Sequence, residues 1–294
     1  MKVKKGLKFK VKNKIYRINV SNTISFLVLI AFALFAALPL VYVVSTSLKP
    51  LDELFLFPPK FLVNNPTLKN FTDLFQALDG EAVPFPRYVF NSFLISLTVV
   101  CLTIIVSVLG AYGLVKHKVF GGKFIVSLIM AGLMFSAYVT RIPSFTIVSE
   151  LGLVDTYGAL IIPNIAVAYN IFLMKQFMEQ IPDQLLEAAR IDGAGEWKIL
   201  TGIVVPMLKP VIATLFVLSF VANWNDYFSP MIYIQNESLK TLPVVLQNLS
   251  SNNSIARAGA TAAATFVTII PTILVYAFMQ KHVVDSMAHS GIKE

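Results

Sequence analysis

Residues 23–47 read TISFLVLIAFALFAALPLVYVVSTS, and none of these 25 side chains is charged. A helix rises by about 1.5 Å per residue, so this run is long enough to cross the roughly 30 Å of hydrocarbon in a bilayer. Basic residues precede the run, as they do in cleavable secretory leaders. The apolar core of a leader spans only about 7–15 residues, however, so we interpret this run as an uncleaved first membrane span.

Five further apolar runs of spanning length follow along the chain. With the first at about 23–48, they lie at about 89–115, 124–148, 159–178, 207–233 and 259–281. Hydrophobic residues make up 56% of the chain, charged residues only 14%, and the mean hydropathy is +0.72, which excludes a water-soluble globular protein. Membrane bundles tolerate prolines inside such runs because neighbouring helices satisfy the freed backbone groups. These prolines are Pro39, Pro143, Pro163 and Pro271. The sequence predicts an all-α membrane protein with six transmembrane helices.

The Lys and Arg residues of the connecting segments indicate the orientation of these spans. If both termini are cytoplasmic, the inside segments carry 17 of these residues and the outside segments carry 6. Cytoplasmic loops are enriched in Lys and Arg, so we predict two cytoplasmic tails, 1–22 and 282–294, around a six-helix domain, 23–281. We interpret the net charge of +8 as a topology signal rather than as a nucleic-acid surface. The longest outside segment, 49–88, is predicted to hold a short surface helix at Leu68–Leu78.

The segment 183–206, between the fourth and fifth spans, is the most informative connection. Asp183 is predicted to cap a helix that follows Pro182, and Gly193 is predicted to end it. A second helical turn should begin at Glu196. The segment is therefore predicted to form a helix, a break and a second helix. The first helix offers apolar and small residues for docking, together with charges that a partner could pair. These residues are Leu185, Leu186, Ala188, Ala189 and Ile191, with Glu187, Arg190 and Asp192. The same pattern also fits an amphipathic connector on the membrane surface.

The stretch Glu187-Ala188-Ala189, with Gly193 six residues after Glu187, resembles the EAA loop of the membrane subunits of ABC importers. The resemblance continues through Ile203 to Pro206, although Val205 stands where that pattern usually has Leu. It implies the fold of a type I ABC importer permease, in which this loop couples a separate ATPase subunit to the spans. The residues that would carry this coupling are Glu187, Ala188, Ala189, Arg190, Asp192, Gly193 and Trp197.

Further stretches are similar to carbohydrate permeases of the maltose MalG type. In chain order they are Phe57–Lys60, Asn65–Phe71, Trp224–Tyr227, Thr241–Val244 and Gln280–Glu294. The similarity implies a location in a bacterial or archaeal cytoplasmic membrane and an oligosaccharide as cargo, without specifying the sugar. It also implies three kinds of partner, namely a second homologous permease subunit in a heterodimer, two ATPase subunits and an extracytoplasmic solute-binding protein.

The sequence offers no catalytic machinery of its own. It contains no Gly-rich loop ending in Lys and Ser or Thr, so ATP and Mg²⁺ are expected in the partner ATPase and no cofactor in this chain. The lone Cys101 lies in an apolar run, and His117, His282 and His289 lie at or beyond span ends. No metal site or nucleophile is therefore predicted, and the chain is not expected to be an enzyme.

Polar residues inside spans are costly in lipid and tend to face the bundle interior or a water-filled cavity. The candidates for a substrate path are Tyr138, Arg141, Asn164, Tyr169, Asn170, Asn223, Trp224, Asn225, Asp226 and Tyr227. Trp224 and Tyr227 could equally belong to an aromatic belt at the membrane interface. Asn164 and Asn170 could instead bridge helices.

Arg141 and Asp226 support a sharper prediction. Counted from the cytoplasmic ends of their spans, they lie at similar depths of about 26 and 28 Å at about 1.5 Å per residue. We predict that they pair with each other or face a shared wet outer vestibule, and pairing with another subunit is the alternative.

Together these patterns favour one half of the sugar pathway of an ATP-driven, binding-protein-dependent importer. An ion-coupled secondary carrier without an ATPase is the alternative, because it would use ionisable residues inside spans such as Arg141 and Asp226. The internal repeat that such carriers usually contain is not visible. A membrane enzyme is the third hypothesis for its function.

Overall fold

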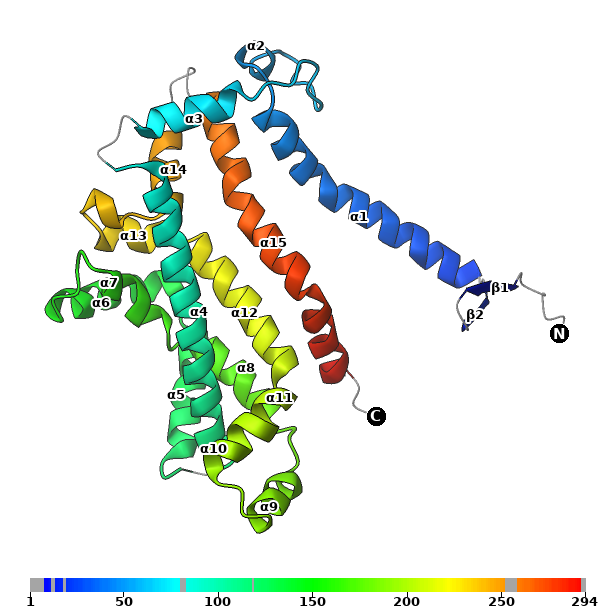
Figure 1. Ribbon diagram of the computed structural model, residues 1–294, viewed down its shortest axis with the longest axis vertical. Coiled ribbons are helices and arrows are strands. Elements are labelled where there is room, and N and C mark those ends of the chain that lie inside the picture. The colour runs from blue at the N-terminus through cyan, green and yellow to red at the C-terminus, as the bar shows by residue number, and fades with distance from the viewer. Residues whose placement is uncertain are drawn as a thin grey trace.

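The computed structural model describes residues 8–11, 14–17, 20–79, 83–117, 119–251 and 258–291, and these are almost entirely helical (Figure 1). Three helices are long and apolar enough to cross a membrane alone: α1 (Val20–Ser47), α4 (Phe85–Val115) and α15 (Ala258–Gly291). Three bent helix pairs also reach spanning length, so the described residues provide three spans, or up to six if each pair is one span. The predicted helical membrane fold is confirmed, whereas length and composition leave the number of spans between three and six.

The predicted spans at 124–148, 159–178 and 207–233 are not continuous helices. In the first, α5 (Gly122–Met134) and α6 (Ala137–Glu150) meet at 117°. In the second, α7 (Tyr157–Ile161) and the 3-10 turn η1 (Ile162–Asn164) meet α8 (Ala168–Met178) at 41°. In the third, α10 (Glu196–Ile199), the π-helical turn η2 (Leu200–Val204) and α11 (Val205–Met207) meet α12 (Lys209–Trp224) at 74°.

The breaks have local causes in the sequence. Phe135 and Ser136 are extended between α5 and α6, and Val167 is extended before α8. Pro210 stands at the start of α12, where its ring excludes a regular hydrogen bond to the preceding turn. The prediction of continuous helices was wrong at these points because an apolar run has the same hydropathy whether it is straight or bent.

The remaining elements lie in the connections. They are the antiparallel strands β1 (Lys8–Val11) and β2 (Lys14–Arg17), the helices α2 (Leu51–Leu54), α3 (Lys69–Asp79), α9 (Asp183–Ile191), α13 (Phe228–Tyr233) and α14 (Leu242–Ser251), and the 3-10 turn η3 (Glu237–Leu239). Helix α3 confirms that the stretch Leu68–Leu78 is helical. The strands correct the all-α prediction, and α15 continues to Gly291 through most of the predicted tail 282–294.

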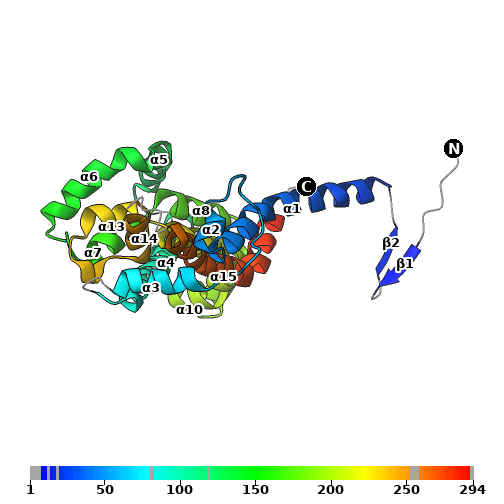
Figure 2. The same cartoon turned by 90° about the horizontal axis from the view of Figure 1, so that it is seen from above.

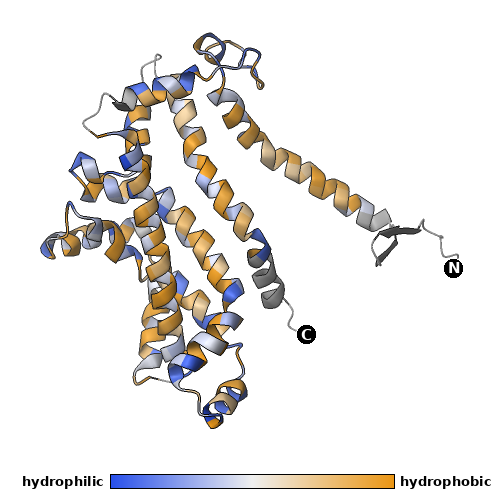
Figure 3. Ribbon diagram, viewed as in Figure 1, coloured by the Kyte–Doolittle hydropathy of each residue, from blue (hydrophilic) through white to orange (hydrophobic). Residues whose placement is uncertain are grey.

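Three clusters of buried side chains hold the bundle together, and two of them lie along α12. The cluster near α3 contains Trp224 and Phe220 of α12 with Tyr88 of α4, and the cluster near α9 contains Met174 of α8 with Leu215 of α12. Helices α4, α8, α12 and α15 thus form the packed centre. By contrast, none of the most apolar 18 residues of α1 is buried. Figures 1 and 2 show α1 leaving the bundle, and Figure 3 shows it coloured hydrophobic along its length.

A polar junction joins α1 to α2 and α3. Asn70 of α3 is 4% exposed, and its Nδ2 donates to the backbone carbonyls of Ser47 and Lys49 at 2.9 and 2.7 Å. The carboxylate of Glu53 in α2 accepts the backbone N–H groups of Asn64 and the following residue at 3.0 and 2.9 Å. The hydrogen bond from the Asn64 N–H lowers the pKa of Glu53, which keeps this carboxylate ionised as an acceptor for the loop.

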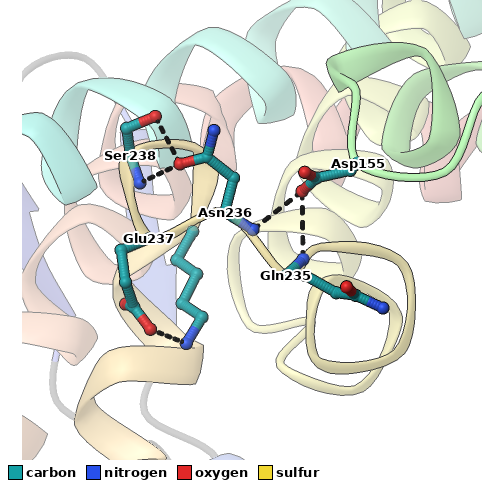
Figure 4. Close-up of polar contacts among 6 residues, drawn as sticks. Asp155, Gln235, Asn236, Glu237 and Ser238 are labelled. Carbon is teal, nitrogen blue, oxygen red and sulfur yellow. Dashed lines mark hydrogen bonds and ion pairs between the residues drawn. The ribbon is translucent and has the colours of Figure 1, made fainter.

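A second network fixes the segment after α13 against α4 and α7 (Figure 4). Asp155 adopts a positive φ of 63°, and its Oδ1 accepts the backbone N–H groups of Gln235 and Asn236 at 3.0 and 2.8 Å. The side chain of Asn236 in turn accepts from the Ser238 N–H at 3.0 Å. From α4, the fully buried Asn91 donates to the Ser238 carbonyl at 2.9 Å. The segment that follows α13 is therefore held in place from both sides.

Candidate functional site

Segment 183–206 lies at the end of the molecule opposite α3 (Figure 1). The predicted helix, break and helix are confirmed, since α9 ends at Ile191 and α10 begins at Glu196. Gly193 has a φ of +79°, the left-handed conformation that favours glycine. The turn lets the Ala194 N–H donate to the Ala189 carbonyl at 2.9 Å, which closes the end of α9.

Helix α9 is anchored on one side and open on the other. Leu186 is 1% exposed and packs with the buried cluster that also contains Met174 and Leu215. On the open side Ile191 is 86% exposed and Trp197 is 71% exposed. Of the predicted coupling residues, only Ala189 is half-buried, and the exposed ones are Glu187, Ala188, Arg190, Asp192, Gly193 and Trp197. The segment presents a mixed apolar and charged face that no described residue covers.

Polar contacts tie this segment to the nearby end of α4. Tyr112 Oη donates to Glu196 Oε2 at 2.6 Å, and Arg190 Nε donates to Glu196 Oε1 at 2.9 Å. Lys116 Nζ donates to Asp183 Oδ1 at 2.7 Å, and its own side chain is only 4% exposed. The hydrogen bond to Glu196 raises the pKa of Arg190 above its already high usual value, so this pair stays charged. Both helices of the segment are thus tied to α4.

One detail of the sequence prediction was wrong, and the roles of three residues were missed. Pro182, not Asp183, occupies the N-cap position of α9, and the Asp183 carboxylate pairs with Lys116. Arg190 pairs with Glu196 within the same segment, and 40% of its side chain stays exposed. No role was predicted for Tyr112 or Lys116, and Glu196 was predicted only as the start of the second helix. These partners lie 84 and 67 residues apart along the chain, beyond the reach of local patterns.

A cavity of about 750 Å³ lies between α5, α6, α8 and the α12–α13 connection. Seven of the ten predicted path residues line it, namely Tyr138, Arg141, Asn164, Tyr169, Asn225, Asp226 and Tyr227. Other residues that line the cavity were not predicted, including Ser144, Phe228 and Tyr233. Because α12 ends at Trp224, residues 225–227 lie in a turn rather than inside a helix. The break between α12 and α13 is what turns these polar side chains toward the cavity.

Arg141 and Asp226 line the same cavity, but the described residues include no ion pair between them. The Arg141 guanidinium lies over the rings of Phe228 and Tyr138, 3.6 and 4.5 Å from their centroids. Asp226 Oδ1 accepts the backbone N–H groups of Phe228 and Ser229 at 3.0 and 3.2 Å, which caps the start of α13. The two residues therefore line one cavity and do not form the direct pair that the first form of the prediction gave.

The remaining three candidates have different surroundings. Trp224 is 1% exposed, stacks against Phe220 and donates its indole N–H to the Thr268 carbonyl at 2.9 Å, so it is a core residue and not a path residue. Asn170 donates to Ser219 Oγ at 3.3 Å and bridges α8 to α12, as its alternative reading held. Asn170 and Asn223 also border a second cavity of about 370 Å³, which shares Asn164, Tyr169 and Asp226 with the first.

Comparisons with known proteins agree with this architecture. The model of the family described as "Binding-protein-dependent transport system inner membrane component" matches residues 18–289. The arabinooligosaccharides transport system permease protein AraQ of Halalkalibacterium halodurans is 29% identical over 93% of this chain and 98% of its own. The lactose transport system permease protein LacG of Rhizobium radiobacter is 34% identical over 71% of this chain and 76% of its own.

A solved structure shares the fold as well. A chain from the crystal structure of a bacterial ABC transporter involved in the import of the acidic polysaccharide alginate superimposes with a TM-score of 0.77. The two chains are 26% identical, and the match covers 90% of this chain and 96% of the other. The resemblance found in the loop at 187–206 therefore extends to nearly the whole chain. This chain belongs to the family of binding-protein-dependent transport system inner membrane components.

Proposed function

We propose that this chain forms one half of the translocation pathway of an ATP-driven importer for an oligosaccharide. The observation that carries the proposal is that α9 exposes one face. Its other side is tied to α4, and the continuous α10–α11 segment links it to α12. In the proposed assembly a second homologous permease completes the pathway as a heterodimer, two ATPase subunits dock on α9 and its counterpart, and an extracytoplasmic solute-binding protein delivers the cargo.

The proposed topology has six spans, with each bent pair counted as one, and both termini in the cytoplasm. The Lys and Arg bias of the sequence supports it, with 17 of these residues on the inside and 6 on the outside. The course of the chain also supports it, because α1 begins and α15 finishes toward the end that carries α9 (Figure 1). In this topology the 750 Å³ cavity opens nearer the outer half of the bundle and α9 faces the ATPase.

The contacts around α9 provide a route for coupling. A displacement of α9 would pull on α4 through Lys116 and through the Tyr112 to Glu196 hydrogen bond. It would also move the α10–α11 segment, which meets α12 at the 74° bend beside Leu208. Since α12 leads directly to Asp226 at the cavity, closure of an ATPase on α9 could change the access of the cavity to either side.

The cavity supports a sugar as cargo. Its volume lies within the roughly 300–1,000 Å³ of small-molecule sites, and it combines aromatic faces with amide, carboxylate and guanidinium groups. Sugar hydroxyls need such hydrogen-bonding groups, and sugar rings stack on aromatic side chains. The relatives named for arabinooligosaccharides and lactose, and the transporter of alginate, support the same class of solute for this chain.

Uptake by proteoliposomes tests the proposal. The chain co-expressed with its partner subunits should take up labelled oligosaccharide only with ATP and the binding protein present, and the chain alone should take up none. Ion-gradient-driven uptake by the chain alone would instead establish the secondary-carrier alternative. Topology is read from the same vesicles after the lone Cys101 is replaced by serine. A membrane-impermeant thiol reagent should reach Asp73→Cys in α3 from outside and Gln184→Cys in α9 only from inside.

The charge of Arg141 should matter for cargo binding. Replacing Arg141 with glutamine removes a cation that lies 3.6 Å from the Phe228 ring centroid in the cavity. A charge-assisted hydrogen bond to a solute is typically worth about 1.5–3 kcal/mol, so the half-saturating concentration for uptake should rise about tenfold or more. ATPase assembly should stay normal, because Arg141 is remote from α9. The matched control is Lys69→Gln, which removes a cation from α3 away from the cavity. Equal kinetics for both variants would count against a role of the cavity in binding.

A further inference from the structure

The segment between α2 and α3 exposes a run of apolar side chains. Residues 55–62, which we call the apolar loop, read FLFPPKFL, and Lys60 is the one charged residue among them. Phe57 is 95% exposed, and the other large apolar side chains of the loop are 42–63% exposed. These are Phe55, Leu56, Phe61 and Leu62. Apolar surface that gathers in this way marks a site of contact with a partner or a membrane, and neither the cavity nor the coupling route involves it.

Polar contacts anchor the backbone of the apolar loop. Lys49 is 3% exposed, and its Nζ donates to the Lys60 carbonyl. Beyond the loop, the Glu53 carboxylate accepts the backbone N–H groups of Asn64 and Asn65 at 3.0 and 2.9 Å. The loop is thus tied to α2 and to the residues that follow α1, while its apolar side chains stay exposed. Their exposure belongs to a held conformation of the chain.

An aromatic contact shows where the apolar loop lies along α1. The ring centroids of Phe61 and Tyr42 are 5.7 Å apart, and Lys49 Nζ lies 5.4 Å from the Tyr42 centroid. Tyr42 precedes the end of α1 at Ser47 by five residues, or about 7.5 Å along the helix axis. Helical side chains point back toward the N-terminus of their helix, so the Tyr42 ring lies no nearer the end of α1 than its own Cα. The loop therefore folds back beside the last turns of this span.

The surroundings of α1 restrict what covers the apolar loop. None of the most apolar 18 residues of α1 is buried, so this span presents its apolar surface to the membrane. Figure 1 shows α2 and the loop after it beside the end of α1 that lies nearer α3. Aromatic rings next to a Lys are typical of the membrane interface, where the rings are buried and the ammonium reaches the headgroups. A transient surface for a soluble protein is typically no more apolar than the rest of a protein surface. The loop therefore fits lipid better than a soluble partner.

We propose that the apolar loop, residues 55–62, is an anchor that inserts into the interfacial region of the leaflet in which α1 ends. Phe57 and Phe61 enter the boundary between headgroups and acyl chains, and the Lys60 ammonium binds phospholipid phosphate. Transfer of one Phe side chain out of water is typically worth about tenfold or more in an equilibrium constant. The anchor sets the depth of the end of α1, to which Asn70 of α3 is hydrogen-bonded. That this leaflet is the outer one rests on the topology in the proposed function.

Quenching by reagents in lipid and in water tests the anchor in the assembled transporter. A bimane label on Phe57→Cys, in a Cys101→Ser background, reports on the apolar loop. The chain and its partner subunits are reconstituted in phosphatidylcholine vesicles that contain a phosphatidylcholine with a nitroxide near the start of its acyl chain, and iodide is the quencher in water. The matched control is Asn65→Cys, an exposed polar position farther along the same connection. We expect the lipid nitroxide to quench the label at Phe57→Cys about twofold more strongly than that at Asn65→Cys, and iodide to show the reverse order.

Substitution of the Phe57 ring gives an independent measurement. With the label on Leu62→Cys, which is 63% exposed, Phe57→Trp should keep the quenching by lipid nitroxide. Phe57→Asp should lower it about twofold or more, because a carboxylate is costly to remove from water. Leu62→Cys also serves as the reporter if Phe57→Cys fails to insert.

Three results would overturn the proposal. The first is iodide quenching at Phe57→Cys as strong as at Asn65→Cys without an effect of the lipid nitroxide. The second is equal lipid quenching in Phe57→Trp and Phe57→Asp. The third is protection from both quenchers that requires the partner subunits or the binding protein, which would assign the loop to a protein contact.

The same vesicles distinguish failure of this inference from failure of the proposed function. ATP-driven uptake reports transport, and the side from which a membrane-impermeant thiol reagent reaches Asn65→Cys reports orientation. Normal uptake without lipid quenching removes only the anchor. Access of the reagent from the inside removes the proposed topology, whatever the lipid quenching at Phe57→Cys.

Discussion

Replacement of Gly193 with valine is expected to reduce ATP-driven uptake by about tenfold or more while leaving the chain inserted in the membrane. Gly193 has a φ of +79°, and a β-branched residue is a rare outlier there, with a cost of at least about 1–2 kcal/mol. The turn sets the angle between α9 and α10 and allows Arg190 to reach Glu196 at 2.9 Å. A changed turn would separate the exposed face of α9 from its ties to α4. Uptake and ATPase activity in proteoliposomes measure the effect, and hydrolysis without uptake is the expected signature of uncoupling.

Two further variants isolate the backbone as the cause. Gly195, two residues on, has a φ of −71° and open space where a Cβ would stand, so Gly195→Ser should transport normally. Gly193 also has open space at its Cβ position, which means that a side chain there meets no steric obstacle and only the backbone conformation matters. Gly193→Asn should therefore retain most uptake, because asparagine tolerates the left-handed region. Normal uptake by Gly193→Val, or inactivity of all three variants, would show that this turn does not set the coupling geometry.

The structure of this loop also shows which of its features the sequence could predict. The helix end at Gly193 and the second start at Glu196 follow from local chemistry, and both were correct. The ties to α4 could not be predicted in the same way. Tyr112 reaches Glu196 across 84 residues, and neither residue differs in its local pattern from an ordinary helix-end residue. Only the packed arrangement of α4 against α10 brings them within 2.6 Å.

The spans and the cavity illustrate the same limit at a larger scale. Hydropathy predicted which segments enter the membrane, because burial in lipid depends on composition. It did not predict the 117° bend between α5 and α6, which places Arg141 beside a cavity instead of inside a straight helix. Trp224 was a candidate for the substrate path because of its residue type and its place inside a span. The Thr268 carbonyl accepts its indole N–H in the core, and this partner lies 44 residues away along the chain.

Replacement of Gly259 with alanine is expected to cause the largest loss of stability among single alanine substitutions of the glycines whose surroundings the structure describes. A Cβ at Gly259 would lie 2.2 Å from Asn70 Oδ1 and 2.8 Å from its Cγ, distances that force Asn70 to move. Asn70 is 4% exposed and makes both hydrogen bonds that link α3 to the end of α1. Loss of two hydrogen bonds from buried groups typically costs about 2–4 kcal/mol. Thermal unfolding in detergent should show a midpoint lower by several degrees, together with reduced yield of assembled transporter.

A double-variant cycle distinguishes this specific clash from a general intolerance of α15 to change. Asn70→Ala alone should also be destabilising, since it removes the same two hydrogen bonds. If the clash with Asn70 is the whole defect, adding Gly259→Ala to Asn70→Ala should cost little more, and the two effects should be far from additive. Gly110→Ala in α4 is the matched control, because its Cβ would meet only Ile171 at 3.9 Å. Alanine there should be neutral or slightly stabilising, as it restricts the unfolded chain. Additive losses in the cycle would mean that the close approach of α15 to α3 depends on contacts other than Asn70.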